Sequence, residues 1–267
     1  MNASIRTVVG TIQAVIQRAR VTGITFLAAA VAYYAFVSLL PALLLLLVVA
    51  TTVVDEAFAE RLVTQTSAFL TPAGQEAILR AIGNGPGAGG ATLVGVVVLL
   101  WSTLKVFRAL DTAFLTVYGQ TDTVGFRSQL QDALVVVLGI GASIVVMIVL
   151  GVVLAALPLG PAGWVVGLLT LPGILTLALL PVYHRFPNPP VPPRQALPGA
   201  VVAALGWTLL QAGFQLYAAS AVQYQAYGVV GGVLLLVTWL YIAAIVVLLG
   251  AIINAVLAGG ELDVAAA

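Results

Sequence analysis

The chain has 267 residues, of which 62% are hydrophobic and only 7% are charged, and its formal net charge at pH 7 is +1. Soluble globular domains carry about 25% charged residues, so this composition excludes a surface that faces water throughout, and the mean hydropathy of +1.16 indicates a membrane protein. The absence of cysteine excludes disulfides and thiolate metal sites, and ten scattered basic residues do not form the clustered basic face of a nucleic-acid binder.

The first element in the chain is polar and basic. Residues 1–22 predict an interfacial helix on the cytoplasmic side rather than a secretory signal, because the apolar run that follows is too long and no cleavage site ends it. On such a helix one face contacts lipid and basic residues contact headgroups. We expect lipid contact from Ile5, Val8, Ile12 and Val15, and headgroup contact from Arg18 and Arg20.

Six apolar runs follow, each long enough for a helix that crosses a bilayer, which takes about 20 residues. They cover residues 24–54, 90–110, 133–157, 164–183, 197–221 and 227–257. Backbone groups in lipid must be hydrogen-bonded within the segment, so we expect all six to be helical. The sequence therefore predicts an all-α polytopic membrane helix bundle with six transmembrane helices, forming a single membrane domain over residues 1–267.

Basic residues set the orientation of such a bundle, because they concentrate in cytoplasmic loops. With both termini in the cytoplasm, the outer side receives only Arg61 and Arg80, in an outer loop over residues 55–89. The cytoplasmic side receives the other eight: Arg6, Arg18, Arg20, Lys105, Arg108, Arg127, Arg185 and Arg194. We expect a multi-pass protein of the cell membrane (plasma or inner membrane).

A proline-rich cytoplasmic link, residues 184–196, is either a stiff spacer or a docking segment for a polyproline-binding partner.

Charged residues interrupt the second apolar run in VVVLLWSTLKVFRALDTAFLTVYG, Val96 to Gly119. On a helix, five polar residues fall within about 140° of arc, namely Lys105, Arg108, Asp111, Thr112 and Thr116. The opposite side carries Phe107, Leu110, Ala113, Phe114 and Val117. A span that enters near residue 90 places Lys105 roughly 22 Å deep and Arg108 roughly 27 Å deep. The polar arc either anchors the helix exit at the cytoplasmic headgroups or faces the bundle interior, where it lines a cavity or holds a lipid phosphate.

The other polar residues within the spans are few. Candidates for contact with a substrate or lipid headgroup are Lys105, Arg108, Thr112, Gln211 and Gln215, the two glutamines being spaced i, i+4 in the fifth span. Candidates for a structural role are Tyr33, Tyr34, Ser38 and Asn254, because polar side chains in lipid usually form hydrogen bonds between helices.

The residues do not indicate an enzyme. Lys105 is the single lysine and lacks the flanking residues of a phosphate-binding loop. The cytoplasmic acids are too dispersed for metal-dependent hydrolysis, so a nuclease is not indicated. We therefore expect no catalytic residues, no metal and no cofactor. The expected partners are membrane lipids, with no nucleic acid, together with a second copy of the chain or another membrane protein.

Three stretches resemble the YihY/virulence factor BrkB family, whose members were formerly labelled ribonuclease BN. They are AAAVAYYAFVSLLPALLLL in the first span, LPGAVVAALGWTLLQAGFQLY in the fifth, and YGVVGGVLLLVTWLYIAAIVVLLGAIINAV in the sixth. WSTLKVFRALDTAFLTVYG is similar to the exit of the family's second span. One departure concerns the closing Gly-Ala-Glu-x-Asn element of the family, where this chain has Ile252 in place of glutamate.

The resemblance implies a six-span helical inner-membrane protein that contributes to envelope integrity, with a role in lipid export. Two hypotheses for the function remain open. The first is a transporter or lipid flippase without an ATPase of its own, in which the arc around Lys105 faces Gln211 and Gln215 across the bundle. The second is a structural or scaffold membrane protein without transport activity, whose partners bind the outer loop or the proline-rich link.

Overall fold

The computed structural model describes residues 2–53, 89–120, 125–156, 163–221 and 228–259. Within these ranges the regular secondary structure is entirely helical. The helices are α1 (Asn2–Val21), α2 (Ile24–Val53), α5 (Gly89–Tyr118), α6 (Phe126–Ala156), α7 (Gly163–Arg185), α8 (Pro193–Ala221) and α9 (Gly228–Leu257). The predicted outer loop, residues 55–89, lies outside the described residues except for Gly89.

The prediction of an all-helical fold is confirmed, because each of the six apolar runs coincides with one helix from α2 to α9. Three helices in the described ranges are long and apolar enough to cross a membrane, in α6, α8 and α9. A fourth candidate arises if α1 and α2 together form one bent span. The number of six spans and the cytoplasmic position of both termini stay predictions.

Glycine residues with a positive φ follow the ends of three helices. Gly23 has a φ of 62° and joins α1 to α2, Gly119 has a φ of 69° directly after α5, and Gly259 has a φ of 77° after α9. A positive φ is strained for residues with a Cβ atom, so glycine is favoured at helix ends of this kind. At Gly23 the chain changes direction by 62° between the axes of α1 and α2.

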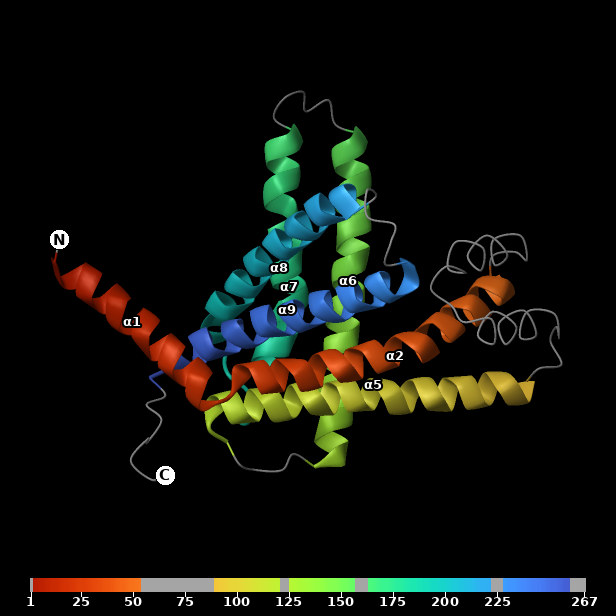
Figure 1. The fold of residues 1–267 in the computed structure, drawn as a ribbon, viewed down its shortest axis with the longest axis horizontal. Helices are drawn as coiled ribbons and strands as arrows, with labels where there is room; N and C mark the ends of the chain where they lie inside the picture. The colour runs from red at the N-terminus through yellow and green to blue at the C-terminus, as the bar shows by residue number, and fades with distance from the viewer. Residues whose placement is uncertain (1, 54–88, 121–124, 157–162, 222–227, 260–267) are drawn as a thin grey trace.

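The helices run in two main directions (Figure 1). Helices α2, α5 and α9 lie side by side, while α6 and α7 pair with each other and cross that group steeply. Helix α8 runs obliquely between the two groups and packs against α7 and α9. The described helices therefore do not form one parallel bundle.

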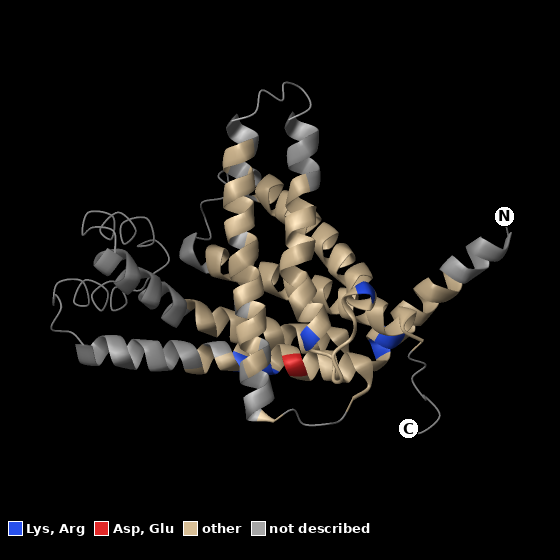
Figure 2. Cartoon of the chain, turned by 180° about the vertical axis from the view of Figure 1, so that it is seen from behind, with Lys and Arg blue, Asp and Glu red and all other residues tan. Residues whose placement is uncertain are grey.

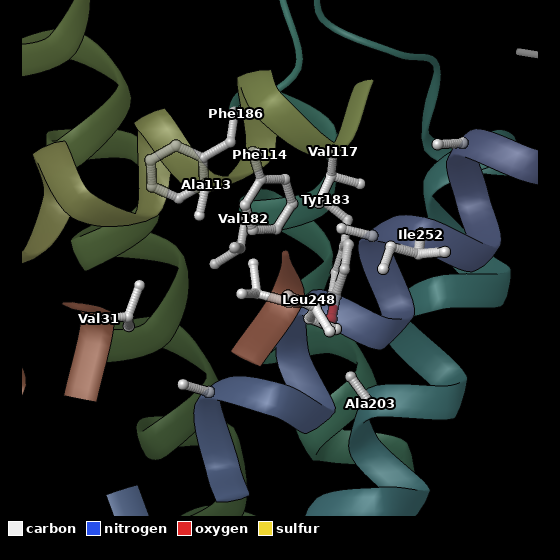
Figure 3. Close-up of a cluster of buried hydrophobic side chains, with 14 of the residues drawn as sticks. Val31, Ala113, Phe114, Val117, Val182, Tyr183, Phe186, Ala203, Leu248 and Ile252 are labelled. Carbon is white, nitrogen blue, oxygen red and sulfur yellow. The ribbon is translucent and has the colours of Figure 1, made fainter. Parts of the chain in front are cut away.

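The buried residues gather where the ends of α5, α7 and α9 meet the beginnings of α2 and α8. We call this set the junction core. Its larger side chains are Phe114, Val117, Tyr183, Phe186, Leu248 and Ile252 (Figure 3). The rings of Phe114 and Phe186 lie with their centroids 5.3 Å apart, and those of Phe114 and Tyr183 lie 5.6 Å apart. The junction core therefore ties α5 to α7.

Small residues allow α8 and α9 to approach closely within the junction core. Ala196, Ala200 and Ala203 of α8 are fully buried, as is Ala251 of α9. A Cβ atom added at Gly199 would lie 2.3 Å from the carbonyl oxygen of Gly250. Close backbone approach through small residues is a common way for helices to associate in lipid, where no hydrophobic effect drives them together.

The link between α7 and α8 is shorter than the predicted residues 184–196. Helix α7 continues through Arg185, and α8 begins at Pro193 because proline is well suited to the first turn of a helix. The link is therefore residues 186–192. The side-chain oxygen of Gln120 accepts a hydrogen bond of 2.8 Å from the backbone N–H of Asn188, which fixes the link beside the end of α5.

Candidate functional site

The cationic face of α5, which we define as Lys105, Arg108 and Thr112, points away from the junction core. All three side chains are exposed, whereas Ala113, Phe114 and Val117 on the other side of the helix are buried. Of the two orientations that the sequence left open for the polar arc, the structure has the one in which these three side chains lie on the protein surface. Here they are accessible to lipid headgroups or to a soluble anion.

An aromatic residue adjoins this face. The Nζ atom of Lys105 lies 5.8 Å from the ring centroid of Trp101, one helical turn earlier, within the range of a cation–π contact. The Trp101 side chain is 65% exposed. Thr112 donates a hydrogen bond of 2.8 Å to the carbonyl oxygen of Arg108, so its hydroxyl oxygen still has lone pairs for a ligand.

Asp111 differs from the other members of the predicted arc. Its side chain is only 7% exposed, so its carboxylate is turned into the protein. On the helical wheel Asp111 lies at the edge of the arc, about 120° from Lys105 and next to the buried side. The exposed part of the arc therefore carries positive charge without an accompanying carboxylate.

The two glutamines of α8 are exposed but lie apart from the cationic face. Gln211 and Gln215 are in the second half of α8, which runs away from α5 (Figure 1). Helix α5 packs mainly against α2 and α9, and α8 mainly against α7 and α9. The structure thus does not bring the five predicted headgroup residues together as one site. It divides them into a group on α5 and a pair on α8.

Aromatic contacts join the part of α8 that carries the glutamine pair to α9. The ring centroids of Trp207 and Trp239 are 5.3 Å apart, and those of Phe214 and Trp239 are 6.4 Å apart, both in edge-to-face arrangements. These contacts join the second half of α8 to the first half of α9. They hold the helix that carries Gln211 and Gln215 in place.

Of the four residues predicted to be structural, Asn254 has the most contacts. It is buried, and its Oδ1 atom accepts a hydrogen bond of 2.6 Å from the N–H of Gly199. Its Nδ2 atom donates one of 2.9 Å to the carbonyl oxygen of Ala196. One side chain of α9 therefore satisfies both a donor and an acceptor in the first turns of α8.

The other three lie in α2 and make local contacts. The rings of Tyr33 and Tyr34 are 5.4 Å apart, edge to face, and Tyr33 is 61% exposed. Ser38 donates a hydrogen bond of 2.7 Å to the carbonyl oxygen of Ala35, within the same helix. None of these three contacts links α2 to another helix.

The prediction that Arg18 contacts lipid headgroups is wrong. The side chain is only 5% exposed, and its Nε atom donates a hydrogen bond of 2.9 Å to the carbonyl oxygen of Val117. A cation at the carboxyl end of a helix interacts favourably with the helix dipole and with carbonyls that lack a partner in the helix. Val15, one turn earlier, was expected to contact lipid, but it packs against the junction core, so the face of α1 that carries both residues turns toward the protein.

Two tyrosines that the sequence analysis did not single out also lie at this junction, Tyr183 buried and Tyr118 half-buried. The hydroxyl of Tyr183 donates a hydrogen bond of 2.6 Å to the carbonyl oxygen of Val247. The hydroxyl of Tyr118 lies near Arg18 and Asn254, but it makes no well-formed hydrogen bond with another described residue. Tyr118 lies beyond the predicted span 90–110, and burial raises the pKa of its phenol to about 12 despite the opposing effect of Arg18.

Positive charge predominates among the charged side chains that the structure describes. The basic residues are Arg18, Arg20, Lys105, Arg108, Arg185 and Arg194, and the acidic residue is Asp111. All of them lie toward one side of the molecule, in the lower half of Figure 2, and the far ends of α6 and α7 carry none in the parts described. Among the described residues there is also no cluster of three or more potential metal ligands.

The virulence factor BrkB family matches residues 15–265, which is nearly the whole chain. The chain belongs to this family. Together with the apolar helices, membership identifies an integral membrane protein, whose lipid-facing surface includes apolar side chains of the kind exposed on α6. The resemblance found in the sequence is thereby confirmed.

Several relatives are similar over parts of the chain. A UPF0761 membrane protein of Aromatoleum aromaticum is 28% identical over 64% of this chain and 44% of its own length. A UPF0761 membrane protein of Pseudoalteromonas translucida is 38% identical over 31% of this chain and 28% of its own length. A protein of Bacillus subtilis, YfkH, whose name describes it as ribonuclease-like, is 36% identical over 32% of each chain.

The alignments thus cover less than half of the length of each of these three relatives. No solved structure matches the chain.

Proposed function

We propose that this BrkB-family protein binds phospholipid headgroups at the cytoplasmic side of the cell membrane and moves the lipids between leaflets, without an ATPase of its own. The observation that carries the proposal is the cationic face of α5. Lys105 and Arg108 are exposed there one turn apart, while Asp111 is buried. The face is thus a place where an anion meets two cations without a competing carboxylate.

The chemistry of this face suits a phosphate group. A guanidinium group can bind two phosphate oxygens at once, and an ammonium group adds a compact charge. Tryptophan is enriched at the boundary between lipid and water, where Trp101 would lie beside the headgroup. An anionic phospholipid fits better than a zwitterionic one, because the α5 face offers no exposed carboxylate to the ammonium of choline or ethanolamine.

Gln211 and Gln215 are proposed as a second polar contact along the same route. Amide side chains that face hydrocarbon have no hydrogen-bond partner, so they favour a passing headgroup or water. Because the two glutamines lie apart from α5, a headgroup would contact the cationic face and the glutamine pair in succession and not in one closed pocket. The energy for directional transport would have to come from another source, since the sequence contains no phosphate-binding loop.

The test is lipid translocation by the purified protein in proteoliposomes, followed with a fluorescent phospholipid whose outer-leaflet label is quenched chemically. We expect Lys105→Ala with Arg108→Ala to reduce the rate at least tenfold, a loss that corresponds to about 1.4 kcal/mol in the barrier. Arg194→Ala, which removes an exposed cation of α8, is the matched control and should leave the rate unchanged. Absence of translocation by the wild type for every phospholipid of the envelope would overturn the proposal.

A second comparison addresses the headgroup. Phosphatidylglycerol should be translocated faster than phosphatidylcholine, and Gln211→Leu with Gln215→Leu should slow both. The scaffold hypothesis predicts the opposite pattern, in which no lipid moves and crosslinking at the link, residues 186–192, captures a stable protein partner or a second copy of the chain.

A further inference from the structure

Helix α1 stands apart from the other helices at one end of the molecule (Figure 1). It is bent by 62° from α2 at Gly23, and its main contact is with α9 near the carboxyl end of that helix. A helix in this position is oblique to the apolar helix α2 that follows it. The side chains around α1 therefore indicate what surrounds this helix.

One face of α1 packs against the protein. Val15 and Ala19 contact the junction core, and Arg18, about 60° beyond Val15 on the helical wheel, is buried against Val117. At about 100° per residue these three positions fall within roughly 100° of arc. This face fixes the rotation of α1 about its axis.

The next part of the circumference is apolar and exposed. Val9, Ile12 and Ile16 are 47%, 53% and 48% exposed, and they fall within about 60° of arc, adjacent to the packed face. Three large aliphatic side chains on one stripe are costly in water, at about 25 cal/mol per Å² of exposed apolar area.

The part of the circumference next to the apolar stripe is polar and exposed. Gln13, Gln17 and Arg20 are all exposed, and they occupy the next arc of about 60°, beyond the apolar stripe. Moving around the helix, one therefore meets protein contacts, then an apolar stripe, then a polar stripe. Such an order fits a helix that lies where protein, acyl chains and headgroups meet.

The charge of α1 identifies the kind of surface. Residues 2–21 contain Arg6, Arg18 and Arg20 and no aspartate or glutamate. A basic helix complements the negative surface of a leaflet with anionic lipids, where each exposed arginine contributes roughly 1 kcal/mol. A neutral or acidic protein surface would not explain why the apolar and polar stripes run in parallel along the helix.

We propose that α1 is a docking helix for an anionic lipid surface, with Val9, Ile12 and Ile16 inserted among acyl chains and Arg20 at the phosphate level. Arg18 fastens this helix to α5. This inference does not depend on lipid translocation, because it concerns a surface on another helix.

The natural chain has no cysteine, so single nitroxide labels can be attached without removing other thiols. Ile12→Cys and Gln17→Cys are a matched pair, since both positions are exposed on the same helix. In proteoliposomes containing phosphatidylglycerol, collisions of the Ile12→Cys label with dissolved oxygen should exceed those with a water-soluble nickel chelate by several-fold. The Gln17→Cys label should show the reverse preference.

Replacing phosphatidylglycerol by phosphatidylcholine, or adding Arg20→Gln, should shift the Ile12→Cys label toward the nickel chelate. Equal access of the chelate to both labels would overturn the proposal, because α1 would then lie in water. Preference for oxygen at both labels would also overturn it, because α1 would then be part of a bent span. Dipolar broadening between Ile12→Cys labels that disappears on dilution with unlabelled protein would instead assign the apolar stripe to a second copy of the chain.

Discussion

The Nε atom of Arg18 donates a hydrogen bond of 2.9 Å to the carbonyl oxygen of Val117, a residue 99 positions later in the chain. Arg18 lies in the last turn of the amphipathic helix α1, and Val117 lies in the last turn of α5. The bond gives a partner to a carbonyl at the end of α5 and places a buried cation at the negative end of the helix. The proposed surface helix is in this way joined to the helix that carries Lys105 and Arg108.

Replacing Arg18 should therefore destabilise the protein. We expect Arg18→Ala to lower the free energy of unfolding by about 1.5 to 3 kcal/mol, the usual contribution of a hydrogen bond from a charged group. Arg20→Ala, two residues away and exposed, should change it by less than about 0.5 kcal/mol. Thermal unfolding in detergent, compared between the two variants, checks this. Equal melting temperatures would show that the bond between α1 and α5 contributes nothing.

The close approach of α8 and α9 predicts opposite effects for two glycines of one helix. At Gly199 an added Cβ atom would lie 2.3 Å from the carbonyl oxygen of Gly250 and 2.5 Å from Nδ2 of Asn254, whereas at Gly213 it would meet nothing within 4 Å. Gly199→Ala should cost about 1 to 3 kcal/mol through overpacking. Gly213→Ala should be neutral or stabilise by up to about 1 kcal/mol through helix propensity. A denaturant titration of both variants would contradict this packing if Gly199→Ala were as stable as Gly213→Ala.

Asn254 should be essential for holding α8 against α9. Asn254→Leu keeps the approximate volume but removes both hydrogen bonds, and the N–H of Gly199 would then lack its partner. We expect a loss of about 1 to 3 kcal/mol. Because Asn254 and Gly199 are in contact, the effects of Asn254→Leu and Gly199→Ala should not add. A double-mutant cycle measures this, and strict additivity would argue against the contact.

Tyr118 and Tyr183 should respond differently to removal of the hydroxyl group. Tyr183→Phe loses the bond to Val247 and should cost about 1 kcal/mol at pH 7. Tyr118→Phe should be nearly neutral at pH 7, because the Tyr118 hydroxyl makes no well-formed hydrogen bond with the described residues. Melting temperatures of the two variants at pH 7 test this contrast.

Alkaline pH should expose a further difference at Tyr118. Its pKa in the folded protein is about 12, above the value of about 10 in an unfolded chain. The unfolded state therefore loses the Tyr118 proton first. The contribution of Tyr118 to the free energy of unfolding is thus constant below pH 10 and falls as the pH rises from 10 to 12. Tyr118→Phe should show a smaller fall over this range than the wild type. Identical pH profiles would mean that the pKa of Tyr118 is not raised in the folded protein.

The presence of these helices could be predicted from the residues alone, because long apolar runs are continuous in the chain and backbone hydrogen bonds in lipid are local. Their bounds were predicted less well, since α5 continues to Tyr118 beyond the expected residue 110 and α6 begins at Phe126 before residue 133. Helix α2 begins at Ile24 and α9 ends at Leu257, as the apolar runs indicate. The helical wheel of α5 also separated Lys105 and Arg108 correctly from Phe114 and Val117. Family membership followed from the same kind of local pattern.

The positions of side chains relative to other helices could not be predicted in this way. Arg18 looked like a headgroup contact, yet it is buried, since its partner Val117 is far along the chain. Asp111 lies at the edge of a helical arc, and only the packing around α5 decides on which side of the boundary it lies. The separation of Gln211 from Lys105 depends on the oblique path of α8, which packs closely against α9 at Gly199 and Gly250. Such contacts join residues that no periodicity relates, so they depend on how the helices pack in three dimensions.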